Sequence, residues 1–164
     1  MKALLGALCL AVAFAAPALA DPSTSPGYTA FDQAQFAKLA AGNGKWVCVD
    51  TPPSTKPDVV TGKQAGNWYV LSETGDQPNV TYVRWNHTLK AYTQIEVDQS
   101  GSSEIFTTTS PDPYNATWKP VFPPGSGLYP FTMTSSGNTF NATGKFKDPK
   151  TGKVMSYTGV CTKN

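Results

Sequence analysis

Short alternations of apolar and polar residues, separated by turn residues, run along most of the chain. The clearest alternation is KAYTQIEVD, residues 90–98. In an extended strand this pattern puts Ile95 and Val97 on one face and Glu96 and Asp98 on the other. We expect the apolar face to point to a core and the polar face to meet solvent.

The same reasoning predicts nine strands joined by tight turns that are rich in Gly, Asn, Asp and Pro. One short helix is predicted before them, in AFDQAQFAKLAAG, where Asp32 can cap the start and Gly42 marks the end. The predicted strands are residues 45–50, 67–73, 79–86, 90–98, 103–109, 115–122, 128–134, 138–146 and 153–162.

Strands at this even spacing, without a βαβ pattern, favour an all-β fold. The architecture that fits best is an antiparallel up-and-down barrel of about eight to ten strands, with a β-sandwich as the alternative. Two longer connections, residues 51–66 and 110–116, interrupt the meander and are predicted to be loops. Such loops either carry function or form a solvated cover over the mouth of the barrel.

The first twenty residues have the layout of a signal peptide, with Lys2 ahead of an apolar run and a small-x-small site that ends at Ala20. The apolar run is shorter than the ~20 residues that a membrane-spanning helix needs. We therefore expect a secreted or periplasmic protein that is cleaved after Ala20. A flexible leader, residues 21–30, would precede a single barrel domain, residues 31–164.

Charge excludes several partner classes. Removal of Lys2 with the signal leaves twelve basic and eleven acidic residues, without a basic run or an acidic tail. This balance predicts no nucleic-acid binding, no attraction to anionic lipid and no membrane insertion after signal cleavage. No nucleotide motif is present, and no cofactor is predicted. The oligomeric state stays open.

Cys9 lies inside the signal and leaves with it, so Cys48 and Cys161 remain. An oxidising compartment favours a disulfide between them. A zinc site fails on ligand count, because His87 is the only other soft ligand and zinc takes four. A thiol nucleophile would need a neighbouring base, which one histidine hardly supplies.

Gly44-x-Trp46, on the first strand after the short helix, resembles the entry motif of the calycin superfamily, which includes the lipocalins and avidin-like barrels. The resemblance implies a lipocalin-like barrel in which Trp46 plugs one end and the last strand returns to the first. Closure would set Cys48 beside Cys161. Lipocalins place an arginine on this Trp, whereas the last strand here offers only Lys153 and Lys163.

Catalytic chemistry has little support in the sequence. His87 is the only histidine, at a predicted hairpin tip, and is expected to be a solvated turn residue. The alternatives for it are a general base or a haem ligand. No residue is therefore assigned as catalytic or as a metal ligand. A buried carboxylate beside His87 or a tyrosine would favour an enzyme after all.

Aromatic residues occur on nearly every strand, where they pack a core or line a cavity. The candidates for ligand binding are Trp68, Tyr82, Trp85, Trp118 and Tyr129. Trp118 follows a Pro-rich segment, and we expect its ring to be exposed at the barrel mouth.

The composition and the aromatic residues together favour non-enzymatic binding of a small apolar or aromatic ligand. The alternatives are an envelope structural or interaction protein without a ligand and a cofactorless isomerase or hydrolase. An interior cavity of at least ~300 Å³ would separate the ligand carrier from the structural protein.

Overall fold

The computed structural model of the chain describes residues 27–164, apart from 53–55, 76–77, 126 and 149–150. The predicted signal peptide and the first part of the predicted leader lie outside the described residues. The elements are α1 (Ala30–Lys38), the 3-10 helix η2 (Leu39–Gly42), β1 (Gly44–Thr51), β2 (Asp58–Ala65), β3 (Trp68–Thr74), β4 (Asn79–Asn86), β5 (Ala91–Asp98), β6 (Ser103–Thr108), β7 (Ala116–Phe122), β8 (Phe131–Ser136), β9 (Thr139–Lys147) and β10 (Val154–Lys163).

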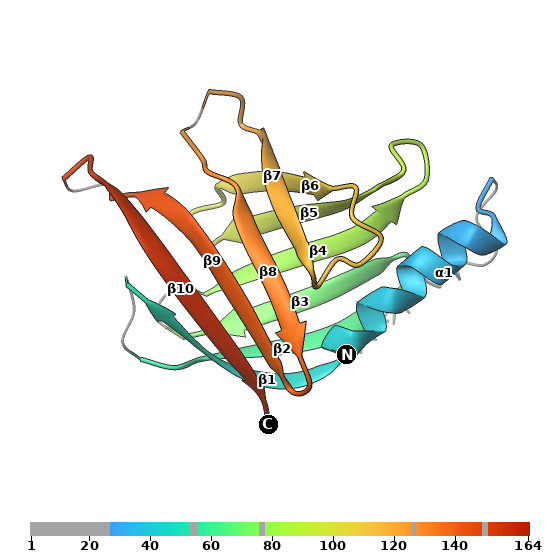
Figure 1. The fold of residues 1–164 in the computed structure, drawn as a ribbon, viewed down its shortest axis with the longest axis horizontal. Helices are drawn as coiled ribbons and strands as arrows, with labels where there is room; N and C mark the ends of the chain where they lie inside the picture. Colours follow the sequence, from blue (N-terminus) through green and yellow to red (C-terminus); the bar gives the residue numbers. More distant parts are fainter. Residues whose placement is uncertain (1–26, 53–55, 76–77, 126, 149–150) are drawn as a thin grey trace, which may run out of the picture.

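The ten strands form one closed antiparallel barrel (Figure 1). Each strand pairs with the next strand in the chain, and β10 returns to pair with β1. This topology confirms the predicted up-and-down barrel with one short helix and rules out the sandwich. Among the described residues, no helix is long and apolar enough to cross a membrane.

Strand β2 lies within residues 51–66, which the sequence predicts to be a loop, so that prediction is wrong. Its pattern is hidden by Gly62 and by polar residues, yet β1 and β3 pair with it on both sides. A side chain at position 62 would collide with the hydroxyl oxygen of Tyr69 and with the backbone oxygen of Gly42. Gly62 is therefore needed for the close approach of Tyr69 to the sheet.

Helix α1 begins with a capping box. Thr29 is the N-cap, its hydroxyl accepts a hydrogen bond from the Asp32 backbone, and the Asp32 side chain accepts one from the Thr29 backbone. The helix packs at one end of the barrel, where the phenol of Tyr92 donates to the backbone oxygen of Gln35 at 2.8 Å. This end is called the closed end below.

Aromatic side chains fill the half of the barrel at the closed end. Trp85 and Tyr92 meet edge to face with ring centroids 5.0 Å apart, and both are buried. Among the described residues, the buried hydrophobic cluster consists of Phe36, Leu39, Tyr69, Val83, Trp85, Tyr92, Phe106, Ala116 and Trp118. Burial of this much apolar surface is the main source of the stability of the fold.

The seam between β1 and β10 closes the barrel. Cys48 lies directly opposite Cys161, and the two form a disulfide, as predicted. Trp46 is buried at the closed end, where its indole N–H donates to the backbone oxygen of Gly42 at 2.9 Å. Lys163 Nζ lies 5.3 Å from the centre of the Trp46 ring. A lysine therefore covers the tryptophan where lipocalins have an arginine.

Candidate functional site

The polar face of β5 points into the barrel. Tyr92 is fully buried and Gln94 is buried, and both share a strand face with Glu96 and Asp98. The expectation that this face meets solvent is therefore wrong. The alternation itself was identified correctly, but in a barrel this wide the interior accepts polar residues as well as apolar ones.

The strand register brings several acidic residues together in the same half of the lumen. Glu96 lies directly opposite Glu104 on β6, and Asn79 on β4 lies opposite Asp98. All of these positions are at the strand ends away from α1, which we call the open end (Figure 1). The strand carboxylates on the inward-facing positions of this half are Asp50, Asp58, Glu73, Glu96, Asp98 and Glu104.

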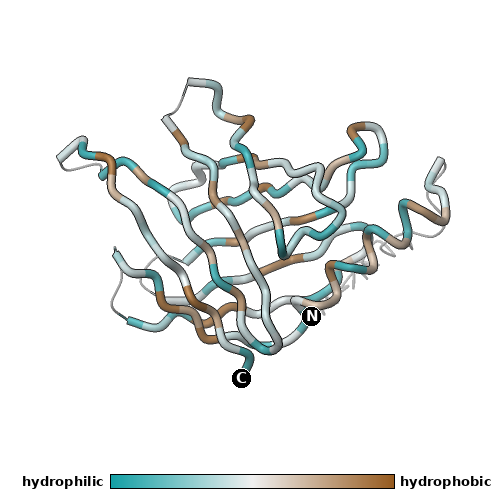
Figure 2. The backbone as a smooth tube through the Cα atoms, viewed as in Figure 1, coloured by the Kyte–Doolittle hydropathy of each residue, from teal (hydrophilic) through white to brown (hydrophobic). Residues whose placement is uncertain are grey.

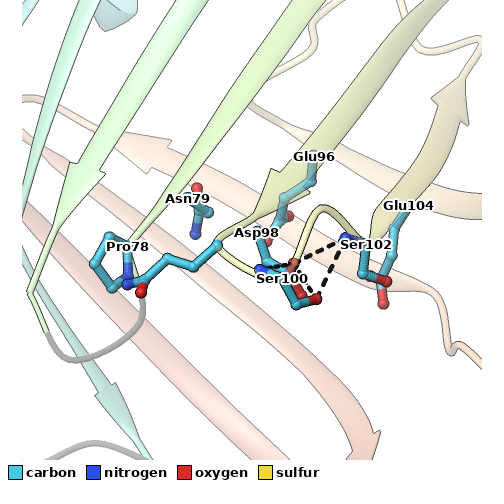
Figure 3. A pocket seen from close by; sticks show the side chains of 8 residues that line it. Pro78, Asn79, Glu96, Asp98, Ser100, Ser102 and Glu104 are labelled. Carbon is cyan, nitrogen blue, oxygen red and sulfur yellow. Dashed lines mark hydrogen bonds between the residues drawn. The ribbon is translucent and has the colours of Figure 1, made fainter.

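A cavity of about 490 Å³ opens beside these carboxylates. Figure 3 shows Glu96 and Glu104 side by side on neighbouring strands, with Asp98 at the start of the turn that joins them. The Asp98 carboxylate is occupied by that turn, since it accepts hydrogen bonds from Ser100 and Ser102. The lining residues are Pro78, Asn79, Glu96, Asp98, Gln99, Ser100, Ser102 and Glu104.

The surroundings change the proton affinity of the glutamates. Burial, followed by the charges of Glu104 and Glu73, raises the pKa of Glu96 to about 7. Burial also raises the pKa of Glu73 to about 7, although Asn79 donates a hydrogen bond of 2.8 Å to its carboxylate. Burial and the charge of Asp98 raise the pKa of Glu104. Near neutral pH these glutamates are therefore only partly ionised, and the proton uptake of each depends on the others.

A tyrosine completes the polar surface of the lumen. Tyr157 on β10 packs against Gly144 on β9, where any side chain would collide with its ring. Burial, followed by the charges of Asp50, Glu96 and Glu104, raises the pKa of Tyr157 to about 12. The phenol thus lies in the field of carboxylates from three other strands.

Neither Glu96 nor Glu104 has a hydrogen bond or a cation partner among the described parts of the chain. Like charges directly opposite each other in a sheet are unfavourable. Within those same residues, no group of His, Cys, Asp and Glu is arranged to hold a metal ion. The pair is therefore a concentration of negative charge next to open space.

The predicted ligand-binding residues lie in three different places: the core, a surface depression and the outer face of the barrel. Trp85 and Trp118 point into the core, and Trp118 is only 2% exposed, with its indole N–H donating to Pro113 at 3.1 Å. The exposed ring expected at Trp118 is therefore wrong. Tyr129 borders a shallow depression on β9 and β10 that also includes Tyr157.

Trp68 and Tyr82 lie on the outer face of the barrel. Each is next in sequence to a buried inward residue, and their rings meet edge to face at 6.1 Å. The guanidinium of Arg84 lies 5.0 Å from the centre of the Trp68 ring. The part that any of the five aromatics plays in ligand binding stays a prediction.

A buried carboxylate does lie beside His87, but it has a structural role. The Asp32 carboxylate is 3.7 Å from His87 Nδ1, and it accepts hydrogen bonds from Thr29 and, at 2.6 Å, from the indole of Trp85. Although burial alone would raise the pKa of Asp32, these hydrogen bonds and Lys90 hold it well below its usual range. The carboxylate thus anchors the helix to the barrel.

Comparison with protein-family models and with curated proteins finds no match to this chain. The ten-strand antiparallel barrel with its short helix is compatible with a lipocalin-like fold. Membership of the calycin superfamily stays a prediction that rests on Gly44, Trp46 and the overall layout.

The residues that line the open end were not singled out as a site in the sequence. The alternation of β5 predicts that Glu96 and Asp98 share a face that meets solvent, and no sequence pattern links Glu104 or Tyr157 to them. The available signal was their shared strand face with Tyr92, an aromatic residue that is more at home in a core than in solvent.

Proposed function

We propose that this protein is an exported, non-enzymatic binding protein that holds a small positively charged organic molecule in the open end of its barrel. The observation that carries the proposal is the facing pair Glu96 and Glu104, without a described cation partner, beside a cavity of about 490 Å³. This volume exceeds the ~300 Å³ at which small-molecule pockets begin.

A cation between the two glutamates would remove their repulsion and take the place of protons. At an effective dielectric constant of about 20, each charge pair at ~4 Å contributes about 4 kcal/mol before the cost of desolvation. Phe106 lies on the inward face of β6, two residues deeper than Glu104. An amine with an aromatic or apolar body would therefore place its charge at the mouth and its body toward the aromatic core.

Two observations support export. The Cys48–Cys161 disulfide is typical of oxidising compartments. The first twenty residues have the layout of a signal peptide, which would direct the chain to such a compartment.

The proposal can be tested with three ligands of similar shape: phenethylamine, 2-phenylethanol and 3-phenylpropionate, which are cationic, neutral and anionic. In titration calorimetry at pH 8 the cation should bind at least tenfold more tightly than the other two, a difference of about 1.4 kcal/mol. If the neutral or the anionic ligand binds more tightly, the protein is still a binding protein, but the proposal that its ligand is a cation is wrong. If all three fail, the proposal fails.

One observation favours a second candidate, a cofactorless acid–base catalyst. Glu96 has its pKa raised to about 7 and lies in the same lumen as Tyr157. A carboxyl group with such a pKa is suited to move protons near neutral pH. Incubation of a bound amino ketone in heavy water distinguishes the two: an enzyme would exchange the hydrogen on the carbon next to the carbonyl group faster than buffer does and lose this activity in Glu96→Gln, whereas a carrier would leave the exchange at the rate in buffer.

A further inference from the structure

Large apolar side chains are exposed at two strand tips of the open end. Val154 and Met155 begin β10, and Val121 and Phe122 end β7. Val154 is 50% exposed and Val121 is 52% exposed. Both tips lie at the end of the barrel away from α1 (Figure 1), where Figure 2 shows hydrophobic colour at the start of β10. A soluble surface normally avoids grouped apolar side chains of this size.

Lysines lie next to these apolar strand ends, in sequence or across the strand pair. Lys145 and Lys147 end β9, Lys153 precedes β10, and all three are exposed. Lys119 is exposed on β7, two residues before Val121. The carboxylate described in the β9–β10 hairpin is Asp148, which accepts a hydrogen bond of 2.6 Å from Thr151.

The separation of charges across the barrel wall explains how a nearly neutral chain acquires a basic surface. The carboxylates of β1 to β6 occupy inward positions, as described above, so they do not offset the lysines on the outside of β7 and β9. The β5–β6 turn, with the exposed Asp98, is the acidic side of the rim. The β7 and β9–β10 side combines exposed apolar residues with exposed lysines.

We propose that the end of β7, the end of β9 and the start of β10 dock the barrel onto an anionic lipid surface. Lysines are attracted to anionic headgroups, and exposed apolar residues between them enter the boundary between headgroups and acyl chains. The proposed contact is peripheral, since it involves side chains at the rim that reach the headgroup region. The proposal is independent of the ligand, since it concerns the outer rim and not the lumen.

The test uses the purified, disulfide-bonded protein and co-sedimentation with vesicles. Vesicles of phosphatidylcholine alone are compared with vesicles in which a third of the lipid is phosphatidylglycerol, at low and at high salt. We expect at least tenfold stronger binding to the anionic vesicles at low salt and loss of that binding at high salt.

Val154→Asp should abolish vesicle binding, and Lys147→Gln with Lys153→Gln should weaken it at least tenfold. Val160→Asp is the matched control, because Val160 is also exposed, at 39%, on the same strand but nearer the closed end. A melting curve of each variant checks that it still folds.

Three outcomes would overturn the proposal: equal binding to both kinds of vesicle, equal loss in Val160→Asp, or no binding. Sedimentation velocity without lipid tests the remaining alternative, that this rim binds a second copy of the chain. Self-association that Val154→Asp removes would assign this rim to a second copy of the chain instead of a membrane.

Discussion

Glu96 on β5 lies directly opposite Glu104 on β6, and both carboxylates point into the barrel. A sheet optimised only for stability would not place like charges in this position. The cavity beside them offers a reason for the arrangement. A cation bound there would be attracted by both carboxylates and would offset their mutual repulsion. The first two predictions below test the energetic side of this relationship.

Glu96→Gln should stabilise the empty protein. The substitution keeps the shape of the side chain and removes a buried charge that faces Glu104. We expect the free energy of unfolding in urea at pH 8 to rise by about 1 kcal/mol. Lys145→Gln, an exposed charge change on β9, should shift it by less than about 0.5 kcal/mol. A less stable Glu96→Gln protein would contradict the account.

Stability should rise as the pH falls from 8 to 5. The pKa values of Glu73 and Glu96 are raised to about 7 in the folded barrel, against about 4.3 in an unfolded chain. Folding therefore favours their protonated forms. The extra stability from their protonation is fully present below about pH 4.3 and is lost as the pH rises through 7. Thermal melting across this range measures it.

Two features of the pH dependence serve as controls. Glu73→Gln combined with Glu96→Gln should flatten the curve between pH 5 and 8. Asp32 acts in the opposite direction, because its pKa is lowered in the folded state, so its contribution is lost only at strongly acidic pH. A melting temperature that rises from pH 5 to pH 8 in the unmodified protein would contradict the predicted state of the glutamates.

Asp32→Ala should loosen the helix from the barrel. The change removes the acceptor for the Thr29 backbone N–H in the capping box and leaves the buried indole N–H of Trp85 without its acceptor. We expect a loss of about 3 kcal/mol in unfolding free energy, together with a change in tryptophan fluorescence. Asp112→Ala, at an exposed loop position, should cost clearly less. Equal losses would mean that the Asp32 network does not anchor the helix.

Reduction of the disulfide should lower the melting temperature. The bridge joins residues 113 apart in the sequence, and a loop of that size corresponds to about 4 to 5 kcal/mol in the chain-entropy model. Differential scanning calorimetry with and without reductant measures the effect. A protein with Cys48→Ala and Cys161→Ala should melt at the lower temperature in both conditions. An unchanged melting temperature after complete reduction would show that the disulfide between β1 and β10 does not stabilise the barrel.

The sequence was informative about the barrel because the required signals are local. Strand alternation, turn residues and two surviving cysteines are read within short segments, and they predicted the meander, the single helix and the Cys48–Cys161 bridge. Strand β2 was missed because Gly62 and the polar residues after it interrupt the pattern that Val59 and Val60 begin, and the neighbouring strands on both sides hold the segment in the sheet.

The candidate site was harder to predict, because alternation gives the period of a strand but not which face points inward. For β5 the more polar face was assigned to solvent, and the barrel reverses this assignment. Glu104 and Tyr157 join Glu96 only through the register of separate strands. The near-neutral net charge also concealed the separation of acidic groups inside from lysines outside.

The central claim, that the glutamates of the lumen bind a cation, is tested most directly with benzyltrimethylammonium, whose charge does not change with pH. Titration calorimetry should show binding at pH 8 that weakens at least tenfold at pH 5, where the glutamates are protonated. The protein with Glu96→Gln and Glu104→Gln should bind weakly at both pH values. Affinity that is independent of pH and unaffected by the double substitution would contradict the account.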